Sequence, residues 1–170
     1  MLKIRSENFS DLEDITKLND LAFEGPQEGK IITAVRKNCT DIFSFVAITD
    51  DKIVGHILFS PSILESATKN IPGMGLAPMA VLPEFQNKGI GSKLALYGIN
   101  KIKNTGCSFI IVLGHENFYP RFGFEPASKY GIKCQWDGVP DQAFMILILN
   151  KKIKLVSGTA KYRKEFFLDL

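Results

Sequence analysis

The 170-residue sequence has no apolar run that approaches the roughly 20 residues needed to cross a bilayer. Its first fifteen residues, MLKIRSENFSDLEDI, carry a charge every few positions, which is not the pattern of a signal peptide or a membrane anchor. Cysteine is scarce: Cys39, Cys107 and Cys134 make an odd number and form no C-x-x-C pair. A disulfide framework and a cysteine-based metal site are therefore poorly supported. We expect buried free thiols, a reducing cytoplasm, no membrane partner and no metal.

An excess of charge of one sign is missing from most of the chain. Residues 151–170 hold six basic and two acidic residues, whereas residues 1–150 hold 15 basic and 16 acidic ones, a net charge of −1. A broad basic face for nucleic acid is thus not expected on the body of the protein. The basic tail is interpreted as a solvated, partly ordered extension, or as an aid in attracting an acidic partner; a nucleic-acid-associated protein is a weaker alternative.

Apolar patterning predicts an α/β (α+β) fold, with one domain over residues 1–150 and a basic extension over 151–170 that packs on it or trails from it. A capping-box signature at Ser10 and Glu13 marks the expected start of the first helix. The helical patterns are SDLEDITKLNDLAF, residues 27–38, residues 88–104 and a short helix that starts in HENFYPRFGF. The strand patterns are LKIRSE, FSFVAIT, KIVGHILFSPSIL, TKNIPGMGLAPMAVLP, CSFIIVLG, GIKCQW and QAFMILILN. This order predicts a mixed sheet covered by helices.

The segment QNKGIGS, residues 86–92, follows a strand pattern and opens a helix pattern, although glycine disfavours helix. It is not the dinucleotide motif G-x-G-x-x-G, because Leu94 occupies the third glycine position. It is not the phosphate loop either, because Ser92 precedes Lys93. Glycines let the backbone approach a ligand closely, and amides at a helix N-terminus attract anions. The segment is therefore either a strand-to-helix turn without a ligand or an anion site.

Pro78 lies inside the strand run LAPMAV, although proline has no N–H to donate to a sheet. Such a proline marks an edge, a bulge or a point at which pairing between strands stops. Gly73 and Gly75, just before it, add to the irregularity of this strand.

Together these motifs resemble the GNAT superfamily of N-acetyltransferases. Residues 81–91, VLPEFQNKGIG, match the family pattern V-x-P-x-[YF]-[RQ]-x-x-G-[IVL]-[GA], and ENFYPRFGF is similar to its later N-x-x-Y-x-x-x-G-F element. The tail VSGTAKYRKEF resembles the YhbS-like branch of predicted acetyltransferases. The resemblance covers nearly the whole chain. It implies a central mixed sheet of about seven strands, helices on both faces and a splayed pair of parallel strands.

The resemblance further implies direct acetyl transfer from acetyl-CoA to a primary amine in a ternary complex, without a metal. The acceptor is the amine of a small molecule or a protein, and the protein is a monomer or a homodimer. Tyr119 stands where the family commonly places a general acid; the alternative is a core tyrosine in an aromatic cluster. The implied acetyl-CoA-binding residues are Met79, Ala80, Val81, Gln86, Asn87, Lys88, Gly89, Ile90, Gly91, Ser92 and Asn117.

The general base has no assignment from sequence. Ala77 stands where many members of the family carry a glutamate, and no carboxylate occurs between Ile71 and Pro83. The remaining candidates are weaker: Glu24, Glu28, His56 and His115. A lone histidine in an apolar strand is more often structural. The missing glutamate also motivates an alternative function, a non-catalytic acyl-CoA-binding module of the same fold.

Overall fold

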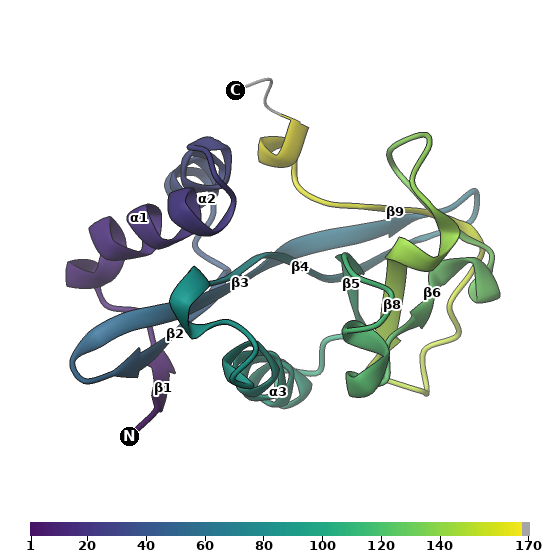
Figure 1. Ribbon diagram of the computed structural model, residues 1–170. Coiled ribbons are helices and arrows are strands. Elements are labelled where there is room, and N and C mark those ends of the chain that lie inside the picture. Colours follow the sequence, from purple (N-terminus) through teal and green to yellow (C-terminus); the bar gives the residue numbers. More distant parts are fainter. Residues whose placement is uncertain (168–170) are drawn as a thin grey trace. The chain divides into compact units, whose positions relative to one another are not determined.

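The computed structural model describes residues 1–167 and consists of two compact units (Figure 1). Unit 1 comprises Met1–Phe59, Ala77–Lys101 and the segment from Lys164 onwards. Unit 2 comprises Ser60–Leu76 and Ile102–Arg163. The last three residues of the predicted extension, 168–170, lie outside the described residues.

Unit 1 contains an antiparallel sheet in which β1 pairs with β2, and β2 pairs with the first half of β3. Three helices pack on this sheet. Its strands are β1 (Lys3–Ser6), β2 (Phe43–Thr49), β3 (Lys52–Glu65, shared with unit 2) and the end of β4 (Asn70–Val81). Its helices are α1 (Leu12–Ala22), α2 (Gln27–Asn38), α3 (Ile90–Lys103) and the 3-10 helices Phe9–Asp11, Pro83–Phe85 and Lys164–Phe167.

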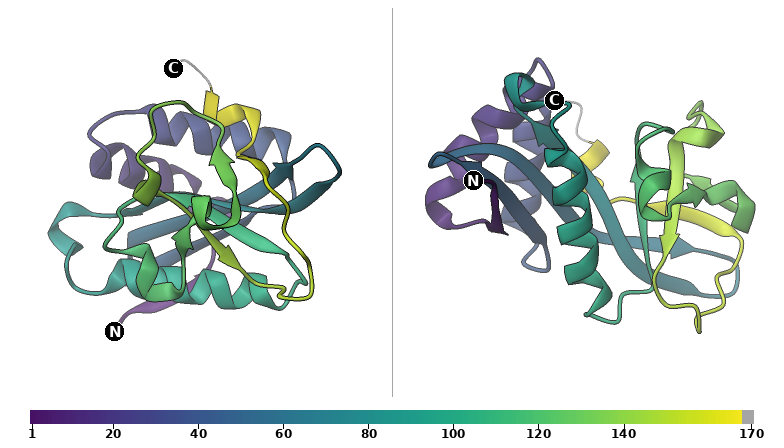
Figure 2. Two further views of the ribbon diagram at one scale, coloured as in Figure 1. Left: turned by 90° about the vertical axis from the view of Figure 1, so that its right-hand side faces the viewer. Right: turned by 60° about the horizontal axis from the view of Figure 1, so that its bottom comes forward.

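Alternation along β2 and β3 gives the sheet of unit 1 two apolar faces. On one face, Val46 and Leu58 form a buried cluster with residues of α1 and α2. On the other, Phe45 packs edge-on against Tyr97 of α3, with ring centroids 5.1 Å apart. The helices therefore cover both faces, as predicted, and Figure 2 shows α3 on the opposite side of these strands from α1 and α2.

Unit 2 is built around β5 (Phe109–Leu113), which runs parallel to β4 and antiparallel to β8 (Phe144–Ile148). Three short strand pairings complete it. Strand β6 (Glu125–Pro126) pairs with β8, while β9 (Gly158–Lys161) pairs with both β7 (Ile132–Cys134) and the end of β3. The 3-10 helices of this unit are Tyr119–Phe122, Ala127–Tyr130 and Asp141–Ala143.

The strand order β1-β2-β3-β4-β5-β8-β6, with β7 and β9 beside this path, confirms the predicted mixed sheet. All seven predicted strands are present, but the described residues form nine. Strand β6 has only two residues, and β9 reads GTAK, a sequence without apolar alternation. Strand β9 forms by pairing with β3 and β7, so local sequence carries little signal for it.

The predicted capping box at Ser10 and Glu13 is wrong. Helix α1 starts at Leu12, and Asp11 holds the turn before it by accepting a bond from the Asn8 N–H at 2.6 Å. The carboxylate of Asp11 also accepts two bonds from the Arg5 guanidinium, at 2.6 and 3.0 Å. These bonds from Arg5 are the main reason that the pKa of Asp11 is lowered. An ion pair to β1 thus sets the start of the helix.

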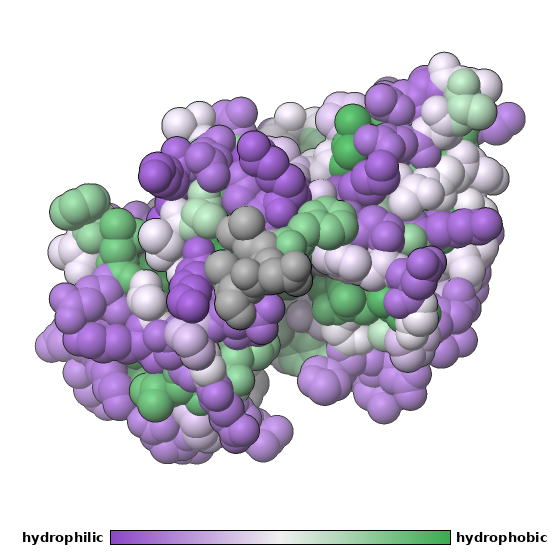
Figure 3. All heavy atoms as spheres, turned by 90° about the horizontal axis from the view of Figure 1, so that it is seen from above, coloured by the Kyte–Doolittle hydropathy of each residue, from purple (hydrophilic) through white to green (hydrophobic). Residues whose placement is uncertain are grey.

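On the face drawn in Figure 3, hydrophilic residues predominate and hydrophobic ones form small patches. Within residues 1–167, no helix has the length and apolar character to span a bilayer. The same residues contain no group of three or more His, Cys, Asp or Glu side chains placed to hold a metal ion. The three cysteines are free thiols that are half-buried, rather than fully buried as expected.

Candidate functional site

The pairing of β4 with β5 stops in the middle of β4. The register places Leu76 opposite Val112, and β4 continues to Val81. In a parallel pair every second residue of a strand bonds to the neighbouring strand. After Leu76, the next residue of β4 that would bond to β5 is therefore Pro78. Proline has no N–H, and the ladder therefore lacks its next donor. On the side of β4 that faces β5, the backbone groups of Met79–Val81 are therefore left for other partners.

The loop after β4 contains two residues with a positive φ. Gly89 has φ +78°, and Asn87 also has a positive φ of 59°. A Cβ on Gly89 would meet no atom within 4 Å, so backbone conformation rather than crowding requires glycine here. Gln86, Asn87, Lys88 and Gly89 are exposed, and this part of the predicted site is open to solvent.

Helix α3 begins directly after this loop and directs unpaired amides towards it. The first helical bond runs from the Lys93 N–H to the Gly89 C=O, at 3.1 Å. Helix geometry gives the amides of Ile90, Gly91 and Ser92, which precede Lys93, no carbonyl within the helix. The positive end of the helix dipole lies at the same place. The segment thus has the donors and the electrostatics of an anion site.

Close packing on β3 fixes the position of this helix end. A Cβ on Gly55 would lie 2.9 Å from Leu94 and 3.2 Å from Ile90, so only glycine lets the first turn of α3 approach the strand this closely. Further along the helix, a Cβ on Gly98 would lie 2.3 Å from the ring of Phe59. Two glycines therefore set the distance between α3 and the sheet.

Basic side chains surround the 3-10 helix that leads into the loop. The Lys88 Nζ lies 5.3 Å from the centroid of the Phe85 ring and donates to the Glu84 C=O at 2.9 Å. Lys52 pairs with the Glu84 carboxylate at 3.1 Å. A bond from its own backbone N–H is the largest cause of the lowered pKa of Glu84, and the bond from Lys52 is the next. Lys52 and Lys88 thus both contact this turn.

Gln86 connects the loop back to the strand. Its Nε2 donates to the Val81 C=O at 3.0 Å. A carbonyl has two lone pairs, so Val81 can accept one further bond. Of the predicted strand residues, Ala80 is buried, and Met79 and Val81 are half-buried.

Tyr119 lies in unit 2, at the start of the 3-10 helix Tyr119–Phe122, and is 7% exposed. Its ring packs edge-on against Phe118 and Phe124, at 5.0 and 5.7 Å. A Cβ on Gly114 would come within 2.3 Å of the ring, so glycine makes room for it. Burial raises the pKa of Tyr119 to about 12, and the phenol stays protonated at neutral pH. Asn117, two residues earlier, is exposed.

His56 is fully buried in unit 1 and has a structural environment. The Asn19 amide donates one hydrogen to the Ile15 C=O at 2.9 Å and lies 3.1 Å from the His56 Nδ1. The Nδ1 is therefore the acceptor, and the protonated Nε2 donates to the Ser44 Oγ at 2.9 Å. Burial, with a smaller contribution from Arg36, lowers the pKa of His56 to about 3. A base that is closed to solvent cannot take a proton from a substrate amine.

The other base candidates lie at the surface. Glu24 and Glu28 line a hollow of about 290 Å³ between α1 and α2, within unit 1. His115 is exposed, and its C=O accepts a bond from the Phe118 N–H in a turn. Ala77, where a glutamate is common in the family, is half-buried.

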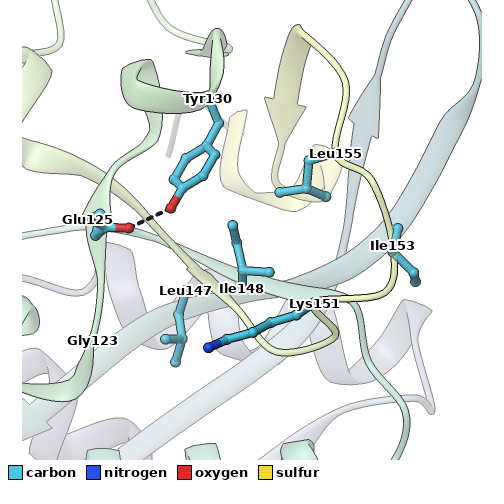
Figure 4. Close-up of a pocket in the computed structure, with 8 residues that line it drawn as sticks. All are labelled: Gly123, Glu125, Tyr130, Leu147, Ile148, Lys151, Ile153 and Leu155. Atoms are coloured by element: carbon cyan, nitrogen blue, oxygen red, sulfur yellow. Dashed lines mark hydrogen bonds between the residues drawn. The ribbon is translucent and has the colours of Figure 1, made fainter.

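A separate cavity of about 590 Å³ lies in unit 2 and contains none of the predicted site residues (Figure 4). Glu125 accepts a 2.5 Å bond from the Tyr130 hydroxyl on one side of it, and Lys151 extends along the other. Its remaining lining residues are Gly123, Leu147, Ile148, Ile153 and Leu155.

Comparison with known proteins identifies the family. The family model of the acetyltransferase (GNAT) domain matches residues 40–126, which is half of the chain and includes β4, the loop and α3. The chain belongs to the GNAT acetyltransferase family. It is 35% identical over 121 residues to the uncharacterized N-acetyltransferase YjhQ of Escherichia coli K12, an alignment that covers 70% of this chain and 67% of YjhQ. It is 27% identical over 165 residues to the uncharacterized N-acetyltransferase YhbS of the same strain, covering 96% of this chain and 97% of YhbS.

Two solved GNAT structures share the fold over nearly the whole chain. The crystal structure of Escherichia coli YhbS in complex with CoA superposes with a TM-score of 0.90 at 27% identity, covering 99% of this chain and 93% of that one. A GNAT acetyltransferase from Brucella melitensis in complex with acetyl-CoA gives a TM-score of 0.79 at 30% identity, covering 98% of each chain. The predicted GNAT membership and fold are therefore confirmed. The enzyme class is N-acetyltransferase, and acetyl-CoA is the acetyl donor of this class.

Proposed function

We propose that the protein transfers the acetyl group of acetyl-CoA directly to a primary amine, on a small molecule or a protein, in a ternary complex. The proposal rests on the order in which structural features follow one another from Pro78 to the start of α3. Pro78 ends the β4–β5 ladder, Met79–Val81 follow it, and the loop then opens α3 at an anion-binding helix end.

In this proposal, each part of that stretch contacts a different part of acetyl-CoA. The backbone of Met79, Ala80 and Val81 pairs with the pantetheine arm, which takes the place of a missing strand. The amides of residues 86–92 hold the pyrophosphate, supported by the dipole of α3 and by Lys88. Asn117 contacts the pantetheine.

The chemistry is the attack of a neutral amine on the thioester carbon. A C–N bond forms, the C–S bond breaks and the sulfur leaves with its electron pair. A backbone N–H near Val81 stabilises the oxyanion of the intermediate. We assign Tyr119 as the general acid that donates its hydroxyl hydrogen to the leaving sulfur. Its pKa of about 12 supports this role, because the proton is present over the whole neutral range.

The amine must also lose a proton, and we assign this step to no side chain. His56 is fully buried in the core of unit 1, and no carboxylate lies on β4 between Ile71 and Val81. In this proposal a chain of water molecules or a backbone carbonyl takes the proton. The missing carboxylate also favours the second candidate function, an acyl-CoA-binding module without turnover.

Tyr119→Phe distinguishes the two functions. As an enzyme, the variant loses roughly 10²–10⁴-fold in kcat while its Kd for acetyl-CoA changes little. Tyr130→Phe is the matched control, because it removes another tyrosine hydroxyl of unit 2, which bonds to Glu125. An unchanged kcat in a folded Tyr119→Phe protein rules out the general-acid role. A wild-type protein that binds acetyl-CoA but turns over no amine supports the binding module.

We also propose a cytoplasmic protein that is a monomer or a homodimer, with residues 1–150 acting as one domain and 151–170 as its extension. Free thiols at Cys39, Cys107 and Cys134 support a reducing compartment. The pairing of β9 with β3 supports an extension that packs on the domain. Gel filtration with light scattering tests the oligomeric state, and truncation after residue 150 tests whether the domain folds without the extension.

A further inference from the structure

A tyrosine that sequence analysis did not single out sits at the end of the β4–β5 ladder. Tyr162 directly follows β9, which Figure 1 shows beside the end of β3. Its hydroxyl donates to the Leu76 C=O at 3.1 Å and accepts from the Leu113 N–H at 3.1 Å. With Leu76 opposite Val112, these two backbone groups are the partners at the last position of the parallel ladder. One side-chain oxygen thus contacts both strands at their final pairing position.

The environment of Tyr162 holds this hydroxyl in place. The side chain is 6% exposed and stacks on the Trp136 indole, with ring centroids 5.7 Å apart. Its backbone N–H donates to the Gln135 Oε1 at 2.6 Å. Gly75 gives the ring its space, because a Cβ there would lie 2.7 Å from it. This explains one of the two glycines that make β4 irregular.

We propose that Tyr162 is a positioning residue that holds the end of the β4–β5 ladder, and so fixes where the pantetheine arm begins to pair with β4. This inference rests on the proposed function. Pro78 removes the next donor on β4, but it does not hold the preceding backbone groups in register. Tyr162 does so, because its hydroxyl offers one donor and one acceptor to the two strands at once. Met79–Val81, the proposed partners of the arm, begin three residues after Leu76.

Tyr162→Phe tests the proposal, because it removes the hydroxyl and keeps the ring on Trp136. We expect the Kd of acetyl-CoA, measured by isothermal titration calorimetry, to rise about tenfold, and the Leu113 amide to exchange faster with solvent. Gly75→Ala, which displaces the ring, should weaken acetyl-CoA binding in the same direction. Tyr130→Phe, the matched control in unit 2, should leave the Kd unchanged. An unchanged Kd in a folded Tyr162→Phe protein overturns the proposal, whatever the loss of thermal stability.

Wild-type hydrogen exchange provides a test that does not depend on a folded variant. We expect the Leu113 amide to be protected both without and with acetyl-CoA, and the Met79 and Val81 amides to gain protection only with it. A Leu113 amide that exchanges freely in the unliganded protein overturns the role of Tyr162. Failure of the wild-type protein to bind acetyl-CoA overturns the proposed function instead, and the exchange of Leu113 still reports on the tyrosine.

Discussion

The buried histidine of unit 1 makes the stability of the protein depend on pH in a way that can be calculated. His56 has an ordinary pKa of 6.5 in the unfolded chain and a pKa of about 3 in the folded protein. Below pH 6.5 the unfolded state therefore binds a proton that the folded state does not. The stabilisation is complete above that pH and is lost progressively as the pH falls towards 3.

The size of the effect follows from the shift. At about pH 5, roughly 1.5 units below the pKa of the unfolded histidine, the loss amounts to about 2 kcal/mol. Protonation is costly because the Asn19 amide already donates towards the Nδ1, so a new N–H would face another donor. The Arg36 guanidinium adds a repulsive charge. Glu7 lies 3.9 Å from the His56 Nε2, but it is already paired with Arg36.

Urea unfolding of the wild type and of His56→Gln measures this contribution. Glutamine does not titrate, so the carboxylates that do titrate cancel in the comparison of the two proteins. The free energy of unfolding of the wild type, relative to the variant, should fall by about 2 kcal/mol between about pH 7.5 and about pH 5.0. If the difference in free energy of unfolding between the two proteins is the same at both pH values, the conclusion that His56 is neutral and buried is refuted.

Three further predictions concern Gly89 in the loop, the packing of α3 on the sheet and the proposed general acid, Tyr119. Gly89→Ala should raise the Kd of acetyl-CoA several-fold, whereas Gly138→Ala should leave the Kd unchanged. Both glycines have a positive φ and open space around them, so each substitution should lower the free energy of unfolding in urea by about 1 kcal/mol. Equal Kd values in the two variants would contradict the loop assignment. Gly98→Ala should destabilise unit 1 by about 1–3 kcal/mol in the same assay, because the methyl group overlaps the ring of Phe59, and no loss would show that α3 shifts freely. The kcat of the wild type should not fall between about pH 7 and about pH 10, since Tyr119 keeps its proton up to about pH 12. A fall in kcat over this range that is absent from the Tyr119→Phe variant would contradict the prediction.

The sequence predicted those parts of the fold that local pattern encodes. The run Phe109–Val112 is buried on both faces of β5, and its continuous apolar character indicated this. Gly89 marked the turn into α3, where the structure gives it a positive φ, and Pro78 marked an irregularity of β4, where the pairing with β5 ends. In each case the residue type carries the backbone property itself, so no knowledge of distant contacts was needed.

The features that sequence analysis missed depend on contacts between separate elements of the fold. The start of α1 is set by Arg5, a residue of β1, which draws Asp11 into an ion pair. Strand β9 has no apolar alternation and forms only because β3 and β7 flank it. Tyr162 gains its place at the β4–β5 ladder through that pairing, 86 residues after Leu76. The local sequence TAKY gives no sign of either.

Catalysis is tested directly by measuring the release of free thiol from acetyl-CoA by the wild-type protein across a panel of primary amines, with mass spectrometry of the products. The panel should include small amines, polyamines, amino acids, aminoglycosides and peptides with a free N-terminus or lysine. We predict thiol release that depends on one class of amine, together with an acetylated product of that class. Binding of acetyl-CoA without amine-dependent thiol release for any member of the panel would contradict catalysis and leave the acyl-CoA-binding module as the function.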